Sequence, residues 1–362
     1  MRLFEHPPWK RFTTIARPLF LSEARTKLIG GFVILAVLLL AVNGMNFLNS
    51  YVMRDFMTSL QQKQPHHFYL FGLALAGVFG LAAIGEAFQF YTEQRTGLFW
   101  REWLTHRLLD RYLAHRAKHR PTANPSVDNP DERISEDGKT FTTSSLSFLV
   151  LGLNSLLTLA LFLGVLWSIT PWLVLTAVLY SAAGTFGTIL LGRRLVPLNN
   201  YQLRKEADFR FGLVGVRQHG ESENGWDGTR NQLRDRFREV VENFRSIIRV
   251  TRNVGFFTRE YNYLIQIIPA LVVAPLYFHG HPFGIIAQAA MAFGQVVGAF
   301  SVIVTKYQEM STLAAVVNRL GSMWEATEPA HEPDTSEGEH EREDERRIDR
   351  GAQERQSAES ER

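Results

Sequence analysis

Cysteine is absent from the 362 residues of this chain. Disulfide bonds, thiolate catalysis and cysteine-based metal sites are therefore excluded. Histidine offers no replacement, because His115 and His119, although four residues apart, stand among arginine and lysine side chains. We expect no metal site.

A nucleotide-binding loop is also missing. Gly220 and Gly225 have the spacing of a P-loop, but Trp226 and Asp227 stand where lysine and serine or threonine hold phosphate and magnesium. No strand is predicted before them. The sequence therefore predicts neither an enzyme nor a cofactor site. The arginine-rich segments are explained by membrane topology, so no nucleic-acid partner is expected.

The chain is rich in long apolar blocks, which a mean hydropathy of −0.08 conceals because charged stretches lie between them. Blocks of about 20 residues match the hydrocarbon core of a bilayer, about 30 Å thick, at about 1.5 Å per helical residue. We predict an all-α membrane protein with six transmembrane helices, at 27–48, 69–91, 146–169, 172–195, 256–278 and 283–307.

Arginine and lysine cluster in the segments 92–145 and 193–255. By the positive-inside rule these segments and both termini face the cytoplasm. The 49–68 loop and the tight turns "SITPW" and "HGHP" then face outward. The cytoplasmic segments show apolar residues at helical spacing, so we expect the membrane helices to continue into the cytosol as amphipathic rods.

Composition divides the chain into three segments. Residues 1–26 form a basic cytoplasmic segment, for which a signal peptide is the competing interpretation; its n-region would be long, and no small-x-small cleavage site follows. Residues 27–326 form the membrane domain. Residues 327–362 are mostly charged and small polar residues, and we predict that this tail is disordered because it cannot bury enough apolar surface to offset its chain entropy.

The polar stretch "DNPDERISED", 128–137, stands between long apolar runs. Asn129 and Pro130 mark a turn, and Asp131 or Ser135 is placed to cap the helix that leads into the third span. The residues alone therefore predict a sharp cytoplasmic corner that feeds a membrane helix.

The order of motifs around this corner carries a resemblance. "REWLTHRLLDRYL" precedes it, and "EADFRFGLVGVRQHGES", "IIPALVVAPLYFHG", "AFGQVVGAFSVIV" and "VVNRL" follow it. The series resembles the SbmA/BacA-like transporter family, which is related to the transmembrane domains of YddA-type and peroxisomal fatty-acid ABC half-transporters. The resemblance implies a six-helix domain of the ABC-exporter type, working as a homodimer, whose family-motif corner consists of Asn129, Pro130, Asp131, Arg133, Glu136 and Asp137.

Two departures from the ATPase-fused members of that group bear on the energy source. Those members continue into a nucleotide-binding domain after the sixth span, whereas this chain has the charged tail. Their segment resembling E-S-I-A-x-Y-x-G-E, which is thought to contact the ATPase, reads "ESENGWDGT" here. We expect this contact segment to be eroded.

Three glutamates lie near the predicted cytoplasmic boundary of the spans: Glu86, Glu260 and Glu309. A carboxylate in lipid costs several kcal/mol, so Glu86, inside the second span, should face a cavity or be protonated. SbmA-like members resemble proton-driven carriers lined by glutamates, which makes these three residues proton-coupling candidates. The alternative is interfacial pairing with Arg259, Arg95 or Lys306.

The run "FGQVVGAF" in the sixth span allows two interpretations. Phe293, Gly294, Gln295 and Gly298 are placed to line a pathway, but Gly294 and Gly298 also form a small-xxx-small pair that packs helices. We favour packing.

The expected function is import of peptides or similar bulky solutes across a bacterial inner membrane, without ATP and coupled to protons. The alternative is the membrane-spanning half of an ABC transporter that works with a separate ATPase subunit. A third possibility is a membrane scaffold that transports nothing. The expected partners are the lipid bilayer, a second copy of the chain and the transported solute.

Overall fold

The computed structural model describes residues 8–118, 129–218 and 226–327, and within these ranges all regular structure is helical. The prediction of an all-α protein is confirmed. The elements are α1 (Pro8–Leu21), α2 (Arg25–Gln61), α3 (Pro65–Lys118), α4 (Pro130–Glu132), the π-helical turn η1 (Arg133–Asp137), α5 (Gly138–Ile169), α6 (Pro171–Gly192), α7 (Leu195–Gln218), α8 (Trp226–Phe278), α9 (Gly284–Thr305) and α10 (Tyr307–Ala326).

Six helical segments are long and apolar enough to cross a membrane, and each overlaps one predicted span. Two predicted ends agree with the structure, because α5 ends at Ile169 and α8 ends at Phe278. Thr170 alone joins α5 to α6, and Pro171 occupies the first turn of α6 as predicted. The chain is a multi-pass membrane protein.

The predicted 49–68 loop is wrong. α2 continues to Gln61 and α3 begins at Pro65, so that only residues 62–64 connect them. Arg54 and Asp55 end the apolar run in the sequence, but their side chains bond to each other, with Nε 2.9 Å from Oδ1. Polarity therefore ends the lipid-compatible stretch without ending the helix, which continues beyond the bilayer.

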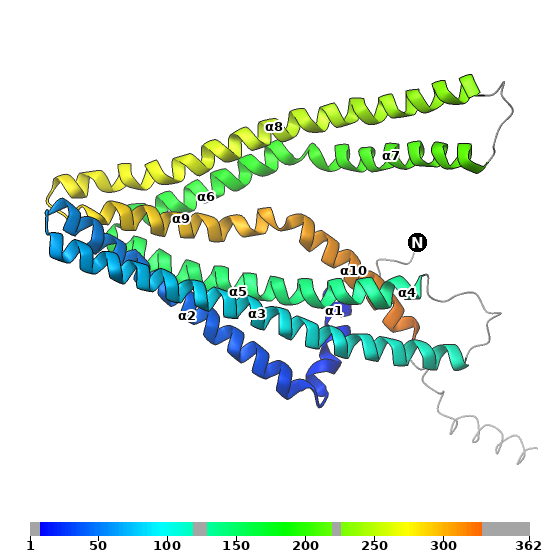
Figure 1. Ribbon diagram of the computed structural model, residues 1–362, viewed down its shortest axis with the longest axis horizontal. Coiled ribbons are helices and arrows are strands. Elements are labelled where there is room, and N and C mark those ends of the chain that lie inside the picture. Colours follow the sequence, from blue (N-terminus) through cyan, green and yellow to red (C-terminus); the bar gives the residue numbers. More distant parts are fainter. Residues whose placement is uncertain (1–7, 119–128, 219–225, 328–362) are drawn as a thin grey trace, which may run out of the picture.

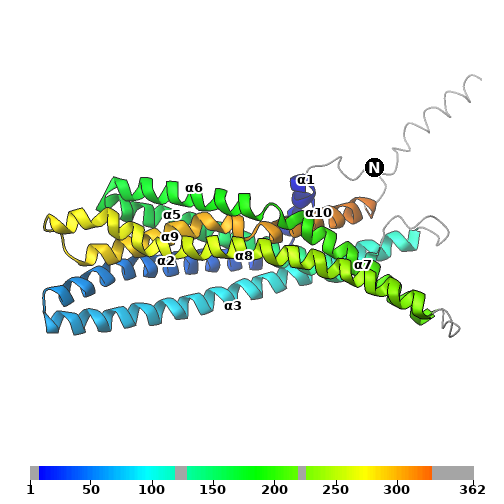
Figure 2. The same cartoon turned by 90° about the horizontal axis from the view of Figure 1, so that it is seen from above.

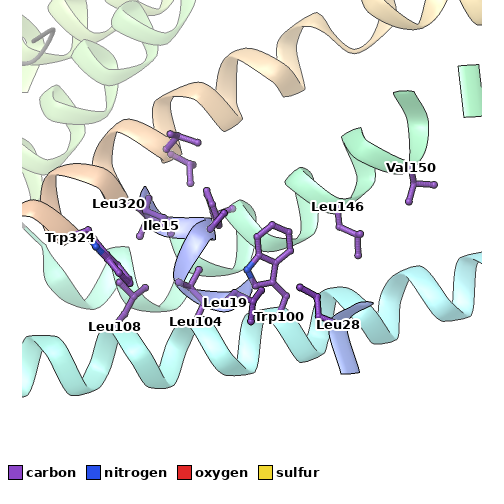
Figure 3. Packing of buried hydrophobic residues seen from close by; sticks show 14 of the residues in the cluster. Ile15, Leu19, Leu28, Trp100, Leu104, Leu108, Leu146, Val150, Leu320 and Trp324 are labelled. Atoms are coloured by element: carbon purple, nitrogen blue, oxygen red, sulfur yellow. The ribbon is translucent and has the colours of Figure 1, made fainter. Parts of the chain in front are cut away.

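Helix α1 is an element that the sequence analysis did not predict. Ile15 and Leu19 of α1 are almost completely buried against α2, α3 and α10, as Figure 3 shows for their neighbours Trp100 and Leu104. The spacing of Ile15 and Leu19 is helical, so the signal was present in the sequence. It was hidden among basic residues.

The helices form an elongated molecule whose short connections gather at one end (Figure 1). Towards the other end, α7 and the adjoining part of α8 diverge from α3, α5 and α10. α7 packs along α8, and α6 packs against both α8 and α9. Figure 2 shows the same elongated bundle from above. We call α7 and residues 226–255 of α8 the α7–α8 arm.

Two hydrophobic cores hold the bundle together. The α10 core joins α1, α2, α3, α5 and α10 around Trp100, Phe141 and Leu320. The α9 core joins α5, α6, α8 and α9 around Phe162 and Phe293, both completely buried. α5 contributes to both cores and therefore connects them.

The turn between α8 and α9 brings the start of α9 against α2. Gly280 has a φ of 99°, in the left-handed region that glycine occupies without strain. The Gly284 N–H donates a hydrogen bond to Thr58 Oγ1 at 3.1 Å. A Cβ atom at Gly284 would overlap the carbonyl group of Arg54. Only glycine allows this approach.

We predict that Gly284→Ala lowers the free energy of unfolding by about 2 kcal/mol, because overpacking forces α2 and α9 apart. The matched control is Gly298→Ala, whose Cβ would meet no atom within 4 Å. The measurement is the thermal unfolding midpoint of the purified protein in detergent. Equal midpoints for Gly284→Ala and the unsubstituted chain would contradict this packing.

Candidate functional site

Helix α10 is held at the end of the bundle opposite the short connections by polar contacts from three other elements. The chain leaves the regular helix at Lys306, with φ −100° and ψ 6°, and α10 then turns away from α9 (Figure 1). α10 packs against α1, η1 and α5. These contacts decide where the last described helix lies relative to the corner at 129–137.

The strongest of these contacts is an ion pair between Asp137 and Arg319. Arg319 Nε donates to Asp137 Oδ2 at 2.8 Å, and Arg319 Nη2 donates to Oδ1. Asp137 is 2% exposed, whereas the Arg319 side chain is half-exposed. Two parallel charge-assisted hydrogen bonds fix both distance and orientation. Arg319 therefore provides the opposite charge that the buried carboxylate of Asp137 requires.

Arg133, in the same corner, makes a second set of hydrogen bonds to α10. Its Nη1 donates to the carbonyl oxygen of Arg319 at 3.0 Å and to Ser322 Oγ at 2.9 Å. Arg133 and Asp137 are the first and last residues of the π-helical turn η1. The turn therefore presents one donor and one acceptor to the same stretch of α10.

The local sequence explains how the corner forms. Asn129 adopts a left-handed conformation with a φ of 46°, and Pro130 follows as the first helical residue. The predicted capping by Asp131 or Ser135 is wrong, because the helix begins before both residues and has no side-chain cap. Ser135 Oγ instead donates to the Asp131 carbonyl at 2.7 Å.

Charge at the corner favours the protonated guanidinium. The hydrogen bond with Asp137 raises the pKa of Arg319 above its usual value, and the nearby carboxylates of Glu132 and Glu136 act in the same direction. A raised folded-state pKa means that this contribution to stability is complete below the ordinary arginine pKa and is lost only above it. Deprotonation of Arg319 therefore does not weaken the pair at physiological pH.

Helix α1 holds the other end of α10. Arg11 Nε and Nη2 donate to the two carboxylate oxygens of Glu325 at 3.0 and 3.1 Å. Gly321 leaves room for the Arg11 side chain, which a Cβ atom there would meet. From α3, the Arg111 guanidinium lies 3.9 Å from the centroid of the Trp324 ring. We call Asp137, Arg133, Arg11 and their α10 partners the α10 clamp.

The structure does not bring the three candidate glutamates together. Glu86 on α3 and Glu260 on α8 are exposed, and within the described ranges neither forms a hydrogen bond or an ion pair. Glu309 accepts a hydrogen bond from Lys306 Nζ at 2.7 Å, the partner that the interfacial interpretation proposes. Proton coupling by these residues remains a hypothesis.

The "FGQVVGAF" residues divide between packing and exposure. Phe293 is completely buried in the α9 core, with its ring centroid 5.6 Å from that of Tyr180. A Cβ at Gly294 would lie 3.7 Å from Ile265 of α8, which is ordinary packing distance. Gly298 is exposed and Gln295 partly buried.

A polar network that the sequence analysis missed lies between α2 and α5. Asn43, which is 2% exposed, donates through Nδ2 to Asn154 Oδ1 at 2.8 Å and to the Leu39 carbonyl at 2.9 Å. Thr158 Oγ1 donates to Asn43 Oδ1 at 2.9 Å. Single polar residues within apolar runs were the available signal, but their pairing depends on how the helices pack.

Sequence comparison connects this architecture to known proteins. Residues 15–278 match the family described as ABC transporter transmembrane region 2. That range begins within α1 and ends with α8. The chain belongs to this family.

Curated relatives of this ABC transmembrane region are longer proteins. The chain is 37% identical over 325 residues to ABC transporter D family member 2, chloroplastic, of Arabidopsis thaliana, covering 86% of this chain and 45% of the relative. It is 38% identical over 301 residues to an uncharacterised ABC transporter ATP-binding protein of Synechocystis, covering 81% and 45%.

A more distant relative bears out one part of the sequence resemblance. The chain is 29% identical over 351 residues to the inner membrane ABC transporter ATP-binding protein YddA of Escherichia coli, covering 89% of this chain and 62% of YddA. The chain thus spans roughly half the length of the first two relatives. The expected relation to ABC half-transporter membrane domains is confirmed.

The sequence analysis missed Arg319 as a functional candidate. It lies in "VVNRL", which contributed only to the resemblance, and its partner Asp137 is 182 residues away. The eroded contact segment "ESENGWDGT" lies mostly within 219–225, outside the described residues, so the prediction about it stays open.

We predict that Asp137→Asn lowers the free energy of unfolding of the ABC transmembrane region by about 1.5 kcal/mol, because the charge-assisted pair is lost. Water around the exposed part of Arg319 screens its charge and keeps the loss moderate. Asp131→Asn, an exposed acid of the same corner, is the control. The free energy of unfolding of Asp137→Asn, Arg319→Gln and the double variant completes a thermodynamic cycle. Strictly additive losses would show that the pair is not coupled.

Proposed function

We propose that this chain is the membrane-spanning half of an ABC transporter and that it works as a C2-symmetric dimer with a separate ATPase subunit. Family membership supports this, as do two relatives whose printed names describe them as ATP-binding proteins of ABC transporters. The matched part of those relatives is their membrane region, so ATP binding is a property of the relatives. For this chain we propose that a separate subunit provides it.

The observation that carries the proposal is the α10 clamp. A force applied to the cytoplasmic ends of the helices reaches α5 through Asp137, α1 through Arg11 and α9 through the chain itself. Interlocked helices move together, whereas loosely joined helices absorb the displacement locally. The clamp therefore suits a domain that converts an ATP-driven movement at its cytoplasmic end into rearrangement of its membrane helices.

The length of the α7–α8 arm supports an external partner. α8 has 53 residues, about 80 Å at 1.5 Å per residue, whereas the hydrocarbon core is only about 30 Å thick. Much of α8 therefore stands outside lipid. Several apolar side chains on this part of the arm are nevertheless exposed, namely Leu203, Phe211, Phe237, Phe244 and Ile248. Such residues are expected to be covered by another protein surface.

A pocket near the tip of the arm offers one docking place. It has a volume of about 510 Å³ and lies between α7 and α8, with Phe209, Leu213, Leu233 and Phe237 in its lining. An aromatic side chain of an ATPase subunit fits a pocket of this apolar character. Under this proposal the ATPase docks at the end of the molecule opposite the short connections, on the cytoplasmic side, and the chain lies in a bacterial inner membrane.

The test is ATP hydrolysis by the assembled transporter. The full chain, purified in mild detergent from membranes of cells that encode it, should carry vanadate-sensitive ATPase activity. Phe211→Asp should remove at least most of that activity, because it places a charge on the exposed apolar face of α7. Gln232→Asp, which adds the same charge at an exposed polar position of α8, should not. Activity no higher than in a mock purification would overturn the proposal.

The second candidate is proton-coupled import of peptides or similar bulky solutes, the activity associated with the SbmA/BacA-like resemblance. One observation favours it: Glu86 and Glu260 lie on membrane helices, and within the described ranges neither is engaged in a hydrogen bond or an ion pair. A carboxylate that alternates between a wet and a dry environment can be protonated in one state and ionised in the other.

Proteoliposomes containing the full chain separate the two candidates. Under proton coupling, a labelled peptide should enter when a pH gradient is imposed, and Glu86→Gln should abolish that uptake because the side chain no longer releases a proton. Glu309→Gln is the control, since Glu309 already has a cationic partner in Lys306. Uptake that needs ATP and an added ATPase subunit, and that ignores a protonophore, would reject proton coupling.

A further inference from the structure

A basic pocket lies between α1, α3 and α10, beside the α10 clamp, and the transport proposals assign no ligand to it. Its volume is about 660 Å³, and its lining includes three arginines, two tryptophans and three hydroxyl side chains. The residues are Thr13, Thr14, Arg17, Pro18, Leu21, Ser22, Trp103, Arg107, Arg111 and Trp324. Figure 3 shows the neighbouring α10 core, in which Leu108 of α3 lies beside Trp324 of α10.

The charge of the pocket is uncompensated by its own lining. No acidic residue lines it, and among the described residues Arg17 and Arg107 have no ion pair or hydrogen bond. Arg111 lies over the Trp324 ring, which fixes its guanidinium at the pocket wall. The one carboxylate of α10 beside α1, that of Glu325, is bound by Arg11. The arrangement therefore favours an anion.

The pocket lies at the level where α2 enters the membrane. Gly31 of α2 is in close contact with Thr96 of the antiparallel helix α3. Trp103 lies seven residues after Thr96 on α3, and Ala24 lies seven residues before Gly31, just ahead of the first residue of α2. Because the two helices are antiparallel, Trp103 is therefore level with Ala24. Tryptophan side chains are enriched at this depth, where lipid headgroups meet water.

Helix α1 has the properties of an interfacial helix. It is amphipathic, because Ile15 and Leu19 are buried while Trp9 and Leu21 are 78% and 72% exposed. Arg17 and Leu21 lie one helical turn apart and both line the pocket, so one face of α1 presents a cation and an exposed apolar side chain to the membrane surface. Arg17 of α1 then faces the same layer as the phosphate groups of the lipids.

We infer that this pocket binds the phosphate headgroup of an anionic phospholipid of the cytoplasmic leaflet. Guanidinium groups hold phosphate by paired hydrogen bonds, and basic pockets beside transmembrane helices are suited to anionic headgroups. The two tryptophans and Leu21 give the glycerol and upper acyl region an apolar wall. Bound lipid joins α1, α3 and α10 and so reinforces the α10 clamp from outside.

The experiment is lipid binding to the full chain in detergent, followed by native mass spectrometry. Phosphatidylglycerol should remain bound under conditions that remove phosphatidylcholine with the same acyl chains. Arg17→Gln combined with Arg107→Gln should weaken phosphatidylglycerol binding about 30-fold, since each basic side chain near an anionic headgroup contributes a factor of about five. Both side chains are exposed, so the fold should be unaffected.

Two further variants control for charge and for folding. Arg238→Gln with Arg245→Gln removes the same charge from exposed positions of the arm and should leave phosphatidylglycerol binding unchanged. Arg17→Lys with Arg107→Lys keeps the charge and should retain most of the binding. The unfolding midpoint of each variant is measured first, and only variants with the midpoint of the unsubstituted chain are compared. A loss of bound lipid then reports on the pocket and not on unfolding. Equal binding by the glutamine variant and the unsubstituted chain would overturn the assignment.

A soluble ligand of the same chemistry is tested in parallel. Glycerol 3-phosphate and inorganic phosphate carry the anion without acyl chains, and each is titrated against the lipid-free chain. The inference requires that they bind far more weakly than phosphatidylglycerol. If either binds as tightly, and the glutamine variant loses it, the pocket serves a soluble phosphate compound and the lipid assignment is wrong.

Discussion

Lipid offers no hydrogen-bond partner to a backbone N–H or C=O group, so every residue that crosses the bilayer has to be paired within its own helix. This constraint shapes the whole chain. It explains why the six crossings are unbroken helices, three pairs of which are joined by short connections at one end of the bundle. It also explains why α2, α3 and α8 continue as helices far beyond the apolar segment, because extending an existing helix is easier than nucleating a new element.

Because lipid offers no hydrogen-bond partners to side chains either, polar side chains with structural roles inside the membrane region bond to one another. Inside the membrane region Asn43, Asn154 and Thr158 satisfy each other across α2 and α5. At the end of the bundle that carries α10, where water screens exposed charges, the chain uses ion pairs, and the buried one at Asp137 is formed by two hydrogen bonds. A helix that ends at the membrane surface is therefore fixed by charge, while helices inside the bilayer are fixed by packing and uncharged hydrogen bonds.

These contacts give the α10 clamp its place in the proposed mechanism and make α1 part of the same assembly. α1, α10 and the corner at 129–137 come from the start, the end and the middle of the described chain, yet they share one core around Trp100, Phe141 and Leu320. Displacement of any one of these elements therefore disturbs the packing of the others. The basic pocket beside this core connects the same assembly to the membrane surface.

Family resemblance and composition together anticipated the class of protein correctly, but the relatives support the alternative, an ABC membrane half, better than the proton-coupled interpretation. The proton-coupled interpretation depended on three glutamates, and one of these, Glu309, pairs with Lys306 at the surface. The relatives instead share the membrane region of ABC transporters. A glutamate near the end of a hydrophobic run has the same appearance in a sequence whether it carries a proton or pairs with a neighbouring lysine.

Local chemistry in the sequence determined the number and order of the membrane helices, the turn at Pro171 and the corner at Asn129 and Pro130. Each of these depends on residues that are neighbours along the chain, through apolar length, fixed proline geometry or backbone conformation. Only the tertiary structure decided that Asp137 meets Arg319 across 182 residues, that Arg11 meets Glu325, and that α1 closes a basic pocket against α3. Charge and hydrophobicity are properties of single residues, whereas a partner far along the chain is selected by the packing of the helices that carry it.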